Sequence, residues 1–389
     1  SSDPGHVHTG ASLSAIPETD ITDGSLLARV ASAETISGIW TFNAGKLLDK
    51  GNIVISLYAY GCVCDGTTDD TTNFQAALDA VPSTGGTVLI PASTKVSSLT
   101  MGNPTTLVAH NRNTTVYGSS ATANVFDCGA TGYHTFKRFS VSTTIARTAG
   151  AAFYVDVPAC RWEEVTVKYP FGGWNLVAGS AYSSIERCQC AFPDTTYAVA
   201  ANSYVATIAH TGDSLVKLAS LYSIGDSTRI ITDGVKITGG GAILLDDVQI
   251  VGCTNGLNMT ASTSTIGSVY VRNTYLDQCV TYGAYIDGTT NAIANIVFEN
   301  VWACGGPTRT PANGIYVTGA NSKEMYFYNV RARLITNDGM ALAAGQGYRI
   351  IGGQFDNCRD GVRVAGGITH VGMNHAIAGT GAGGTANSG

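Results

Sequence analysis

Charged side chains recur in this sequence at spacings that would bring them together if repeats of the chain stack. Asp246, Arg272 and Glu299 are separated by 26 and 27 residues, and Asp247 adjoins the first of them. Inverting glycosidases use two carboxylates about 6.5–9.5 Å apart with a water between them. Stacking at about 4.8 Å per repeat would place Asp246 and Glu299 roughly 10 Å apart at the backbone. The spacing predicts that one is a general acid and the other a general base, with Arg272 tuning their pKa values.

Two other interpretations of these charges stay open. In a lyase, Arg272 would neutralise a uronate carboxylate while a tyrosine or another base removes the adjacent proton. Alternatively, Arg272 neutralises both acidic neighbours in an exposed charge ladder, and such ion pairs are common and weak. The same position in other repeats holds Glu163, Glu186 and Tyr328, a pattern that fits a ladder as well as a catalytic site.

Aromatic side chains recur at a neighbouring position of the repeat. Tyr275, Trp302 and Arg331 are 27 and 29 residues apart, and Tyr285 and Tyr316 form a second such row. Aromatic rings stack on the flat apolar faces of pyranoses, and Arg binds hydroxyls or carboxylates. These rows predict a sugar-binding surface, and the alternatives are an aromatic ladder that stabilises a sheet or a subunit interface. The first row also contains Thr166, Gln189, Gln249 and Gln354.

The repeat that aligns these residues has a period of about 27 and is marked by an Asp or Asn between apolar positions. Asp247, Asn273, Asn300 and Asn329 are 26, 27 and 29 residues apart. Residues 350–355 continue the series with Gly352 at that place, and residues 162–167 and 185–190 extend it toward the N-terminus. A period of this length indicates a solenoid.

A glycine followed by alternating apolar residues forms the second element of each repeat. Short alternating segments without helix between them predict strands with one buried face, and we expect each glycine to occupy a corner with a left-handed backbone. The chain is therefore predicted to be all-β, a right-handed parallel β-helix with roughly nine coils, about 43 Å long, over residues 130–370. The glycines are Gly173, Gly256, Gly283, Gly314, Gly339 and Gly361.

Composition excludes several classes of protein. The chain has 389 residues, of which 13% are charged and 44% hydrophobic, and a disordered chain needs more charge and fewer apolar groups. The net charge is -6 and the 22 basic residues are scattered, which argues against a nucleic-acid partner. No apolar run approaches the 18 or so residues that cross a bilayer, so we expect no membrane partner.

Ten cysteines could indicate disulfides or a metal site, but their spacing does not. Cys253, Cys279 and Cys304 are 26 and 25 residues apart, and Cys358 lies 54 beyond. Spacing at the period of the repeat predicts buried thiols stacked at one structural position, because free cysteine is among the most buried residue types. We therefore predict no metal and no cofactor.

One helix is predicted over residues 70–81, with Asp69 or Asp70 as its N-cap. Phe74, Ala77, Leu78 and Val81 would form its apolar face, and we interpret it as a lid on the exposed end of the solenoid. The segment YGCVCDGTTDDTTNFQAALDA at 60–80, followed by GGTVLIP at 85–91, resembles the opening of the pectate-lyase superfamily β-helix. That pattern occurs in bacteriophage tailspikes, polysaccharide lyases and glycosidases, so it implies a fold and not a reaction.

The N-terminal segment resembles phage tail-fibre and tailspike proteins. The resemblance lies in GHVHTG at 5–10 and AETISGIWTF at 33–42. It implies that residues 1–50 attach the protein to other phage tail proteins or oligomerise it, with residues 51–379 forming the β-helix and 380–389 a flexible Gly-rich tail. His6 and His8 could gather around a metal on a three-fold axis, although solvated histidines are the more common case.

The sequence contains only some of the catalytic motifs found in one related class of enzymes. Polygalacturonase-type hydrolases carry NTD, DD, GHG and RIK motifs in order. Thr232-Asp-Gly234 and Asp246-Asp247 are similar to the first two, and no GHG or RIK comes after them. The resemblance implies a homotrimeric tailspike on the virion tail that binds and degrades a bacterial surface polysaccharide. The alternatives are a non-enzymatic glycan-binding or structural tail protein, and a secreted, monomeric bacterial lyase or hydrolase.

Overall fold

The computed structural model describes residues 46–49, 52–168, 171–191, 202–225, 230–365 and 368–374. The chain divides into two compact units, residues 1–42 and 43–389. Most of the predicted attachment segment, including His6 and His8, lies outside the described residues, as does the predicted tail at 380–389. The described residues therefore all belong to the second unit.

Strands of the second unit form three stacked ladders. We call them ladders A, B and C, and each is defined by parallel pairing of strands from successive coils.

Ladder A contains β2 (Asn52–Ser56), β3 (Gly86–Ile90), β6 (Thr105–Ala109), β9 (Thr135–Lys137), β12 (Arg161–Glu163), β15 (Ser184–Glu186), β18 (Lys217–Ala219), the end of β20 (Ile231–Asp246), β23 (Ile266–Arg272), β26 (Ile293–Glu299), the start of β29 (Ser322–Arg333), the start of β31 (Gln346–Asp356) and β33 (Thr369–Asn374).

Ladder B contains β4 (Thr94–Val96), β7 (Thr115–Gly118), β10 (Ser140–Thr143), β13 (Thr166–Lys168), β16 (Gln189–Ala191), β19 (Tyr222–Ile224), β21 (Gln249–Val251), β24 (Tyr275–Asp277), β27 (Trp302–Cys304) and the ends of β29 and β31.

Ladder C contains β5 (Leu99–Thr100), β8 (Phe126–Cys128), β11 (Phe153–Val155), β14 (Gly172–Val177), β17 (Tyr204–Asp213), the start of β20, β22 (Cys253–Thr260), β25 (Tyr282–Asp287), β28 (Asn313–Thr318), β30 (Asp338–Leu342) and β32 (Asp360–Val364).

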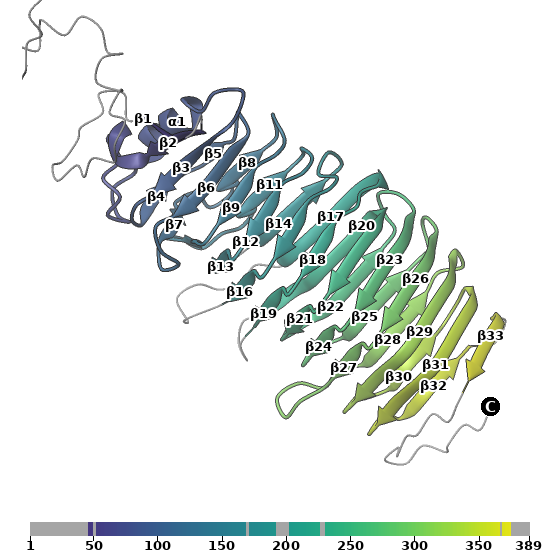
Figure 1. Cartoon of the computed structure of the whole chain (residues 1–389). Helices are drawn as coiled ribbons and strands as arrows, with labels where there is room; N and C mark the ends of the chain where they lie inside the picture. The colour runs from purple at the N-terminus through teal and green to yellow at the C-terminus, as the bar shows by residue number, and fades with distance from the viewer. Residues whose placement is uncertain are drawn as a thin grey trace, which may run out of the picture. The chain divides into compact units, whose positions relative to one another are not determined.

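Each coil passes through ladders B, C and A in turn, as β24, β25 and β26 do (Figure 1). Nine successive parallel pairings lead from β9 to β33 in ladder A, which agrees with the roughly nine coils predicted over residues 130–370. Among the described strands, β1 (Lys46–Asp49) pairs antiparallel with β2. The predicted parallel β-solenoid is confirmed.

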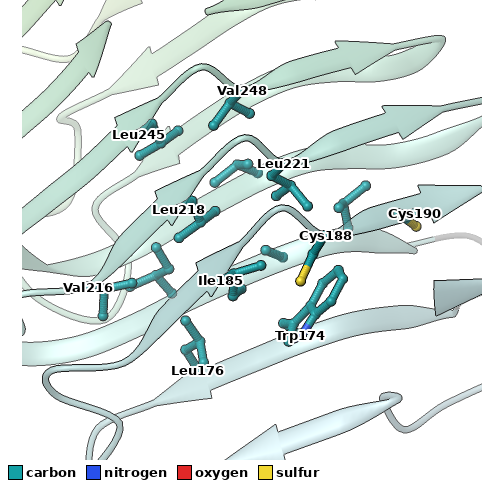
Figure 2. Close-up of a cluster of buried hydrophobic side chains, with 14 of the residues drawn as sticks. Trp174, Leu176, Ile185, Cys188, Cys190, Val216, Leu218, Leu221, Leu245 and Val248 are labelled. Atoms are coloured by element: carbon teal, nitrogen blue, oxygen red, sulfur yellow. The ribbon is translucent and has the colours of Figure 1, made fainter. Parts of the chain in front are cut away.

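Inward-facing side chains of successive coils stack into one continuous core. Ile185, Leu218 and Leu245 are partners in the register of ladder A, are 0–1% exposed, and lie one above another in Figure 2. Aromatic rings stack in the same way, with Phe136 and Trp162 at 5.5 Å between centroids. Contact between equivalent residues of adjacent coils explains why the apolar positions repeat at the period of the coil.

The glycine that opens the ladder C strands serves close packing, so the predicted left-handed corner is wrong. Gly256, Gly283 and Gly314 do not have positive φ. A Cβ on Gly283 would lie 2.5 Å from the carbonyl oxygen of Gly314, and a Cβ on Gly314 would lie 2.3 Å from that of Gly339. Any side chain here would therefore collide with the next coil.

The predicted cysteine stack is correct at three of its four positions. Cys253, Cys279 and Cys358 each lie two residues past an equivalent ladder B position and are buried. Cys304 is instead the register partner of Asp277 within ladder B, where it is half-buried. Its spacing of 25 from Cys279 comes from a difference in position within the coil, not from equivalence.

The helix α1 spans Thr71–Asp79, with Phe74, Ala77 and Leu78 buried. Asp70 occupies the N-cap position without a side-chain capping bond. Its buried carboxylate accepts hydrogen bonds from the backbone of Val63 and Cys64 and from Thr94. The preceding short helix is η4 (Leu57–Tyr60). A lid role for α1 stays a prediction. Within the described part of the chain, no helix is long and apolar enough to span a membrane.

Candidate functional site

The predicted row of Asp and Asn residues forms the corner between ladders A and B. Asp247, Asn273, Asn300 and Asn329 have φ of 55°, 50°, 52° and 49°. Each backbone N–H of the first three donates to a carbonyl of the following coil, at 3.0–3.2 Å. Asn and Asp tolerate this left-handed conformation better than other side-chain-bearing residues. The row is confirmed, and backbone conformation explains its composition.

Side chains in this row hydrogen-bond to one another along the solenoid. Asn329 Nδ2 donates to Asn300 Oδ1 at 2.8 Å, and Asn300 Nδ2 donates to Asn273 Oδ1 at 3.3 Å. Asn273 Nδ2 donates to Asp246 Oδ1 at 3.2 Å. We call Asp246, Asn273, Asn300 and Asn329 the amide chain. Asp247 is not part of this chain, and its carboxylate accepts a hydrogen bond from Ser220 Oγ at 2.8 Å.

The aromatic row lies directly beside the corner, on the outer face of ladder B. Tyr275, Trp302 and Arg331 are register partners on three successive coils. The Tyr275 and Trp302 rings meet edge to face at 5.1 Å, and Arg331 Cζ lies 5.2 Å from the Trp302 ring centroid. The predicted alignment of this row is therefore confirmed.

Between Thr166 and Gln354, sequence reasoning missed one member of this row. Tyr222 pairs with Gln189 on one side and Gln249 on the other. Its distance of 27 residues from Gln249 could have revealed it. The distance of 33 residues back to Gln189 hid it, because this coil is longer than the others.

A groove brings the corner and the aromatic row together. It has a volume of about 370 Å³ and is lined by residues of four coils: Asp247, Asn273, Tyr275, Asn300, Val301, Trp302, Asn329 and Arg331. The structure thus unites one predicted catalytic residue, Asp247, with three predicted binding residues. Ring faces, amides and a guanidinium side by side are groups that bind hydroxyl-rich ligands.

The predicted catalytic carboxylates lie on the ladder A side of the corner. Asp246, Arg272 and Glu299 are register partners on successive coils. Arg272 Nη2 lies 2.8 Å from Asp246 Oδ2, and this hydrogen bond, helped by that from Asn273, lowers the pKa of Asp246. Asp246 in turn raises the pKa of Arg272. Asp246 is thus held as an anion.

Glu299 has a different environment from Asp246. Within the described residues it forms no ion pair with Arg272 inside 4.0 Å. Arg272 and Glu299 line a second hollow of about 480 Å³ together with apolar side chains that include Leu215, Tyr270 and Val297. One carboxylate is therefore ion-paired and joined to the amide chain, while the other borders an apolar hollow.

Tyr285 and Tyr316 do not belong to this groove. They are register partners on ladder C, with rings stacked at 6.0 Å, and Tyr282 packs against both at 5.0 and 5.3 Å. Burial and Asp287 raise the pKa of Tyr285 to about 12. The two predicted rows of binding residues therefore lie on different ladders.

No cluster of three or more His, Cys, Asp or Glu side chains in the described ranges is arranged to hold a metal ion. His134 and His210 are both buried. His210 Nε2 lies 2.7 Å from Ser180 Oγ, and burial lowers the pKa of His134 to about 4. The surroundings of these two histidines are those of core residues.

Comparison with solved structures identifies the fold of this chain. No family model and no curated protein matches the sequence. The tailspike protein of E. coli bacteriophage HK620 in complex with pentasaccharide matches with a TM-score of 0.63 and 16% identity, over 84% of this chain and 66% of the tailspike. The mannuronan C-5 epimerase A-module of Azotobacter vinelandii matches with a TM-score of 0.55 and 13% identity, over 82% of this chain and 99% of the module. The chain therefore has the parallel β-helix fold of these structures, as the resemblance to the pectate-lyase superfamily predicted.

Proposed function

We propose that the groove at the corner of ladders A and B binds a bacterial surface polysaccharide. The observation that carries this proposal is a groove spanning four coils in which Tyr275, Trp302 and Arg331 lie beside the three asparagines of the amide chain. Because successive coils contribute equivalent positions to the groove, it suits a polymer of similar sugar units. Solved tailspikes of the same fold were captured with a pentasaccharide and a hexasaccharide, which supports the same class of ligand.

The proposed reaction is hydrolysis by Asp246 and Glu299 of a glycan that extends from the groove across the corner onto ladder A, since these carboxylates immediately precede the groove-lining Asp247 and Asn300 in the chain. Asp246, with its lowered pKa, suits the general base that activates water, which leaves Glu299 the role of general acid. Arg272 keeps Asp246 ionised, and Asp247 orients groups in the groove. Two coils separate the carboxylates' backbones by roughly 10 Å, which side chains can shorten to the distance that inversion requires.

The test combines binding with product formation on a panel of capsular and O-antigen polysaccharides. Trp302→Ala should reduce binding to the polysaccharide that wild type binds by at least tenfold. Tyr133→Ala, which removes an exposed aromatic ring that does not line the groove, should leave this binding unaltered. Asp246→Asn and Glu299→Gln should each abolish release of reducing ends, and Glu299→Gln should leave binding intact. Activity that survives both carboxylate changes would disprove the catalytic assignment but not the binding groove.

A glycan-binding protein without catalysis is the second candidate. The 2.8 Å pair between Arg272 and Asp246 favours it, because that geometry also fits a charge ladder that stabilises the sheet. Binding without unsaturated or reducing-end products across the panel would select this candidate.

Assembly and location complete the proposal. We place the protein on the virion tail as a homotrimer, joined to other tail proteins through residues 1–50, and a secreted monomeric enzyme is the alternative. Sedimentation separates the two, since the chain mass of 40.3 kDa would triple in the trimer.

A further inference from the structure

The amide chain has a direction, and Asp246 imposes it. An ionised carboxylate can only accept hydrogen bonds, and the ion pair with Arg272 keeps Asp246 ionised. Asn273 must therefore turn its NH₂ toward Asp246, which leaves its Oδ1 to accept from Asn300. The same constraint passes to Asn329, whose Nδ2 donates to Asn300.

The chain of hydrogen bonds stops at Asn329 because the next corner residue is Gly352. Tyr328 pairs with Ile351 and Val330 with Gly353, so Gly352 occupies the rung after Asn329. Gly352 has a φ of 67°, and a Cβ on it would have Asn329 N at 4.0 Å as its nearest neighbour. The Oδ1 of Asn329 thus receives no side-chain donor from the next coil, and the space beside Gly352 is open.

Asn329 lies at the groove wall together with two of the proposed binding residues. Trp302 and Arg331 line the same groove, and the guanidinium lies over the indole. At this end the groove offers a ring face, charged donors and a free acceptor. The earlier rungs differ, because each of their amide oxygens already accepts from the next asparagine.

We propose that Asn329 defines the terminal subsite of the groove, where a pyranose hydroxyl donates to Asn329 Oδ1 in place of the missing rung. This inference rests on the proposed glycan-binding function. The sugar ring lies against Trp302, and Arg331 donates to its other oxygens. A sugar hydroxyl can donate to this amide oxygen, whereas its deoxy or O-methyl form cannot, so the subsite selects a sugar with a free hydroxyl over those analogues.

Gly352→Asn tests this subsite by supplying the missing rung. Asn accepts a left-handed φ, and its Nδ2 would donate to Asn329 Oδ1. The probes are oligosaccharides released by mild acid from purified bacterial lipopolysaccharide, titrated calorimetrically into wild type and variants. We expect Gly352→Asn to weaken binding of the oligosaccharide that wild type binds by about threefold to tenfold, the loss of one hydrogen bond, with an equal or higher Tm.

Gly352→Asp is the matched control, because its carboxylate has the same shape but cannot donate to Asn329. It should weaken binding less than Gly352→Asn, and equal weakening by both would mean that bulk alone is responsible and overturn the proposal. Asn329→Gly keeps the backbone conformation and removes the acceptor, so it should weaken binding by the same factor as Gly352→Asn. The double variant Gly352→Asn with Asn329→Gly should lose no more binding affinity than either change alone, since both changes remove the same interaction with the sugar.

The outcomes separate the subsite from the function on which it rests. If Gly352→Asn binds the oligosaccharide as tightly as wild type does, the proposed subsite is wrong, while the proposed groove still stands. Absence of wild-type binding to every oligosaccharide overturns the proposed function and the subsite with it. A lower Tm for Gly352→Asn would show that the rung cannot form, and Asn329→Gly alone would then decide the proposal.

Discussion

Arg272 Nη2 lies 2.8 Å from Oδ2 of Asp246, one coil away along ladder A. The partner that lowers the pKa of Asp246 is therefore some two dozen residues distant in sequence. The pair links the charge column of ladder A to the amide chain of the corner, because the other oxygen of Asp246 accepts from Asn273.

Replacing Arg272 should make the stability of the protein depend less on pH below about pH 4. The lowered pKa means that the stabilisation is complete above the unfolded value of about 3.9 and disappears as the pH falls through the lower folded value. Arg272→Gln should slightly lower the free energy of unfolding at pH 7, because exposed ion pairs are weak, and the difference from wild type should shrink as the pH falls below about 4. Urea unfolding across this range measures it. Lys323→Gln, a change of an exposed lysine on the same ladder, is the charge-matched control and should show no such convergence.

Two glycine substitutions should have opposite effects. Gly283→Ala puts a Cβ 2.5 Å from the carbonyl oxygen of Gly314 and should destabilise by about 1–3 kcal/mol, as overpacking does. At Gly267 the nearest atom to a Cβ is Ala294 O at 3.8 Å, and its φ is not positive. Gly267→Ala should stabilise the protein by about 0.4–1 kcal/mol, because alanine lowers the conformational entropy of the unfolded chain. Equal Tm values for the two variants would contradict the close-packing explanation.

The corner conformation can be separated from its side-chain hydrogen bonds at Asn300. Asn300→Gly removes the bonds to Asn273 and Asn329 while permitting a φ of 52°. Asn300→Ala removes the same bonds and also strains the backbone, so it should cost about 1–2 kcal/mol more. Chemical unfolding of both variants measures the difference, and indistinguishable midpoints would count against backbone conformation as the reason for asparagine.

Cys304 should be the first thiol to react in the native protein. It is half-buried, whereas Cys279 is fully buried. Burial raises the pKa of Cys304 to about 11 and that of Cys279 to about 12, so alkylation by iodoacetamide should be slow at pH 8 and rise about tenfold per pH unit toward 11. Mass spectrometry of timed samples checks the order. Cys304→Ser should remove the fastest phase and Cys279→Ser should preserve it.

The solenoid and its rows could be predicted because equivalent residues of stacked coils contact one another. Asn273 and Asn300 repeat at the period of the coil, and so do Tyr275 and Trp302, since each must fit directly above the residue one turn earlier. The prediction failed at Tyr222, where the length of the coil changes. It also failed at Cys304, where a spacing close to the period joins residues that are not at equivalent positions of their coils. Glycine was assigned correctly to its row but for the wrong reason, because distance between coils cannot be read from spacing.

The period of the chain and the alternation of its strands determined the architecture, the line of the corner residues and the neighbours within each row. Tertiary structure decided which rows share a surface: Trp302 meets Asn300 in the groove, while Tyr316 lies on another ladder. It also decided that the amide chain is directed from Asn329 to Asp246. Stacking fixes neighbours along the axis by one repeated distance, whereas contacts around the coil depend on the angles between ladders and on side-chain conformations.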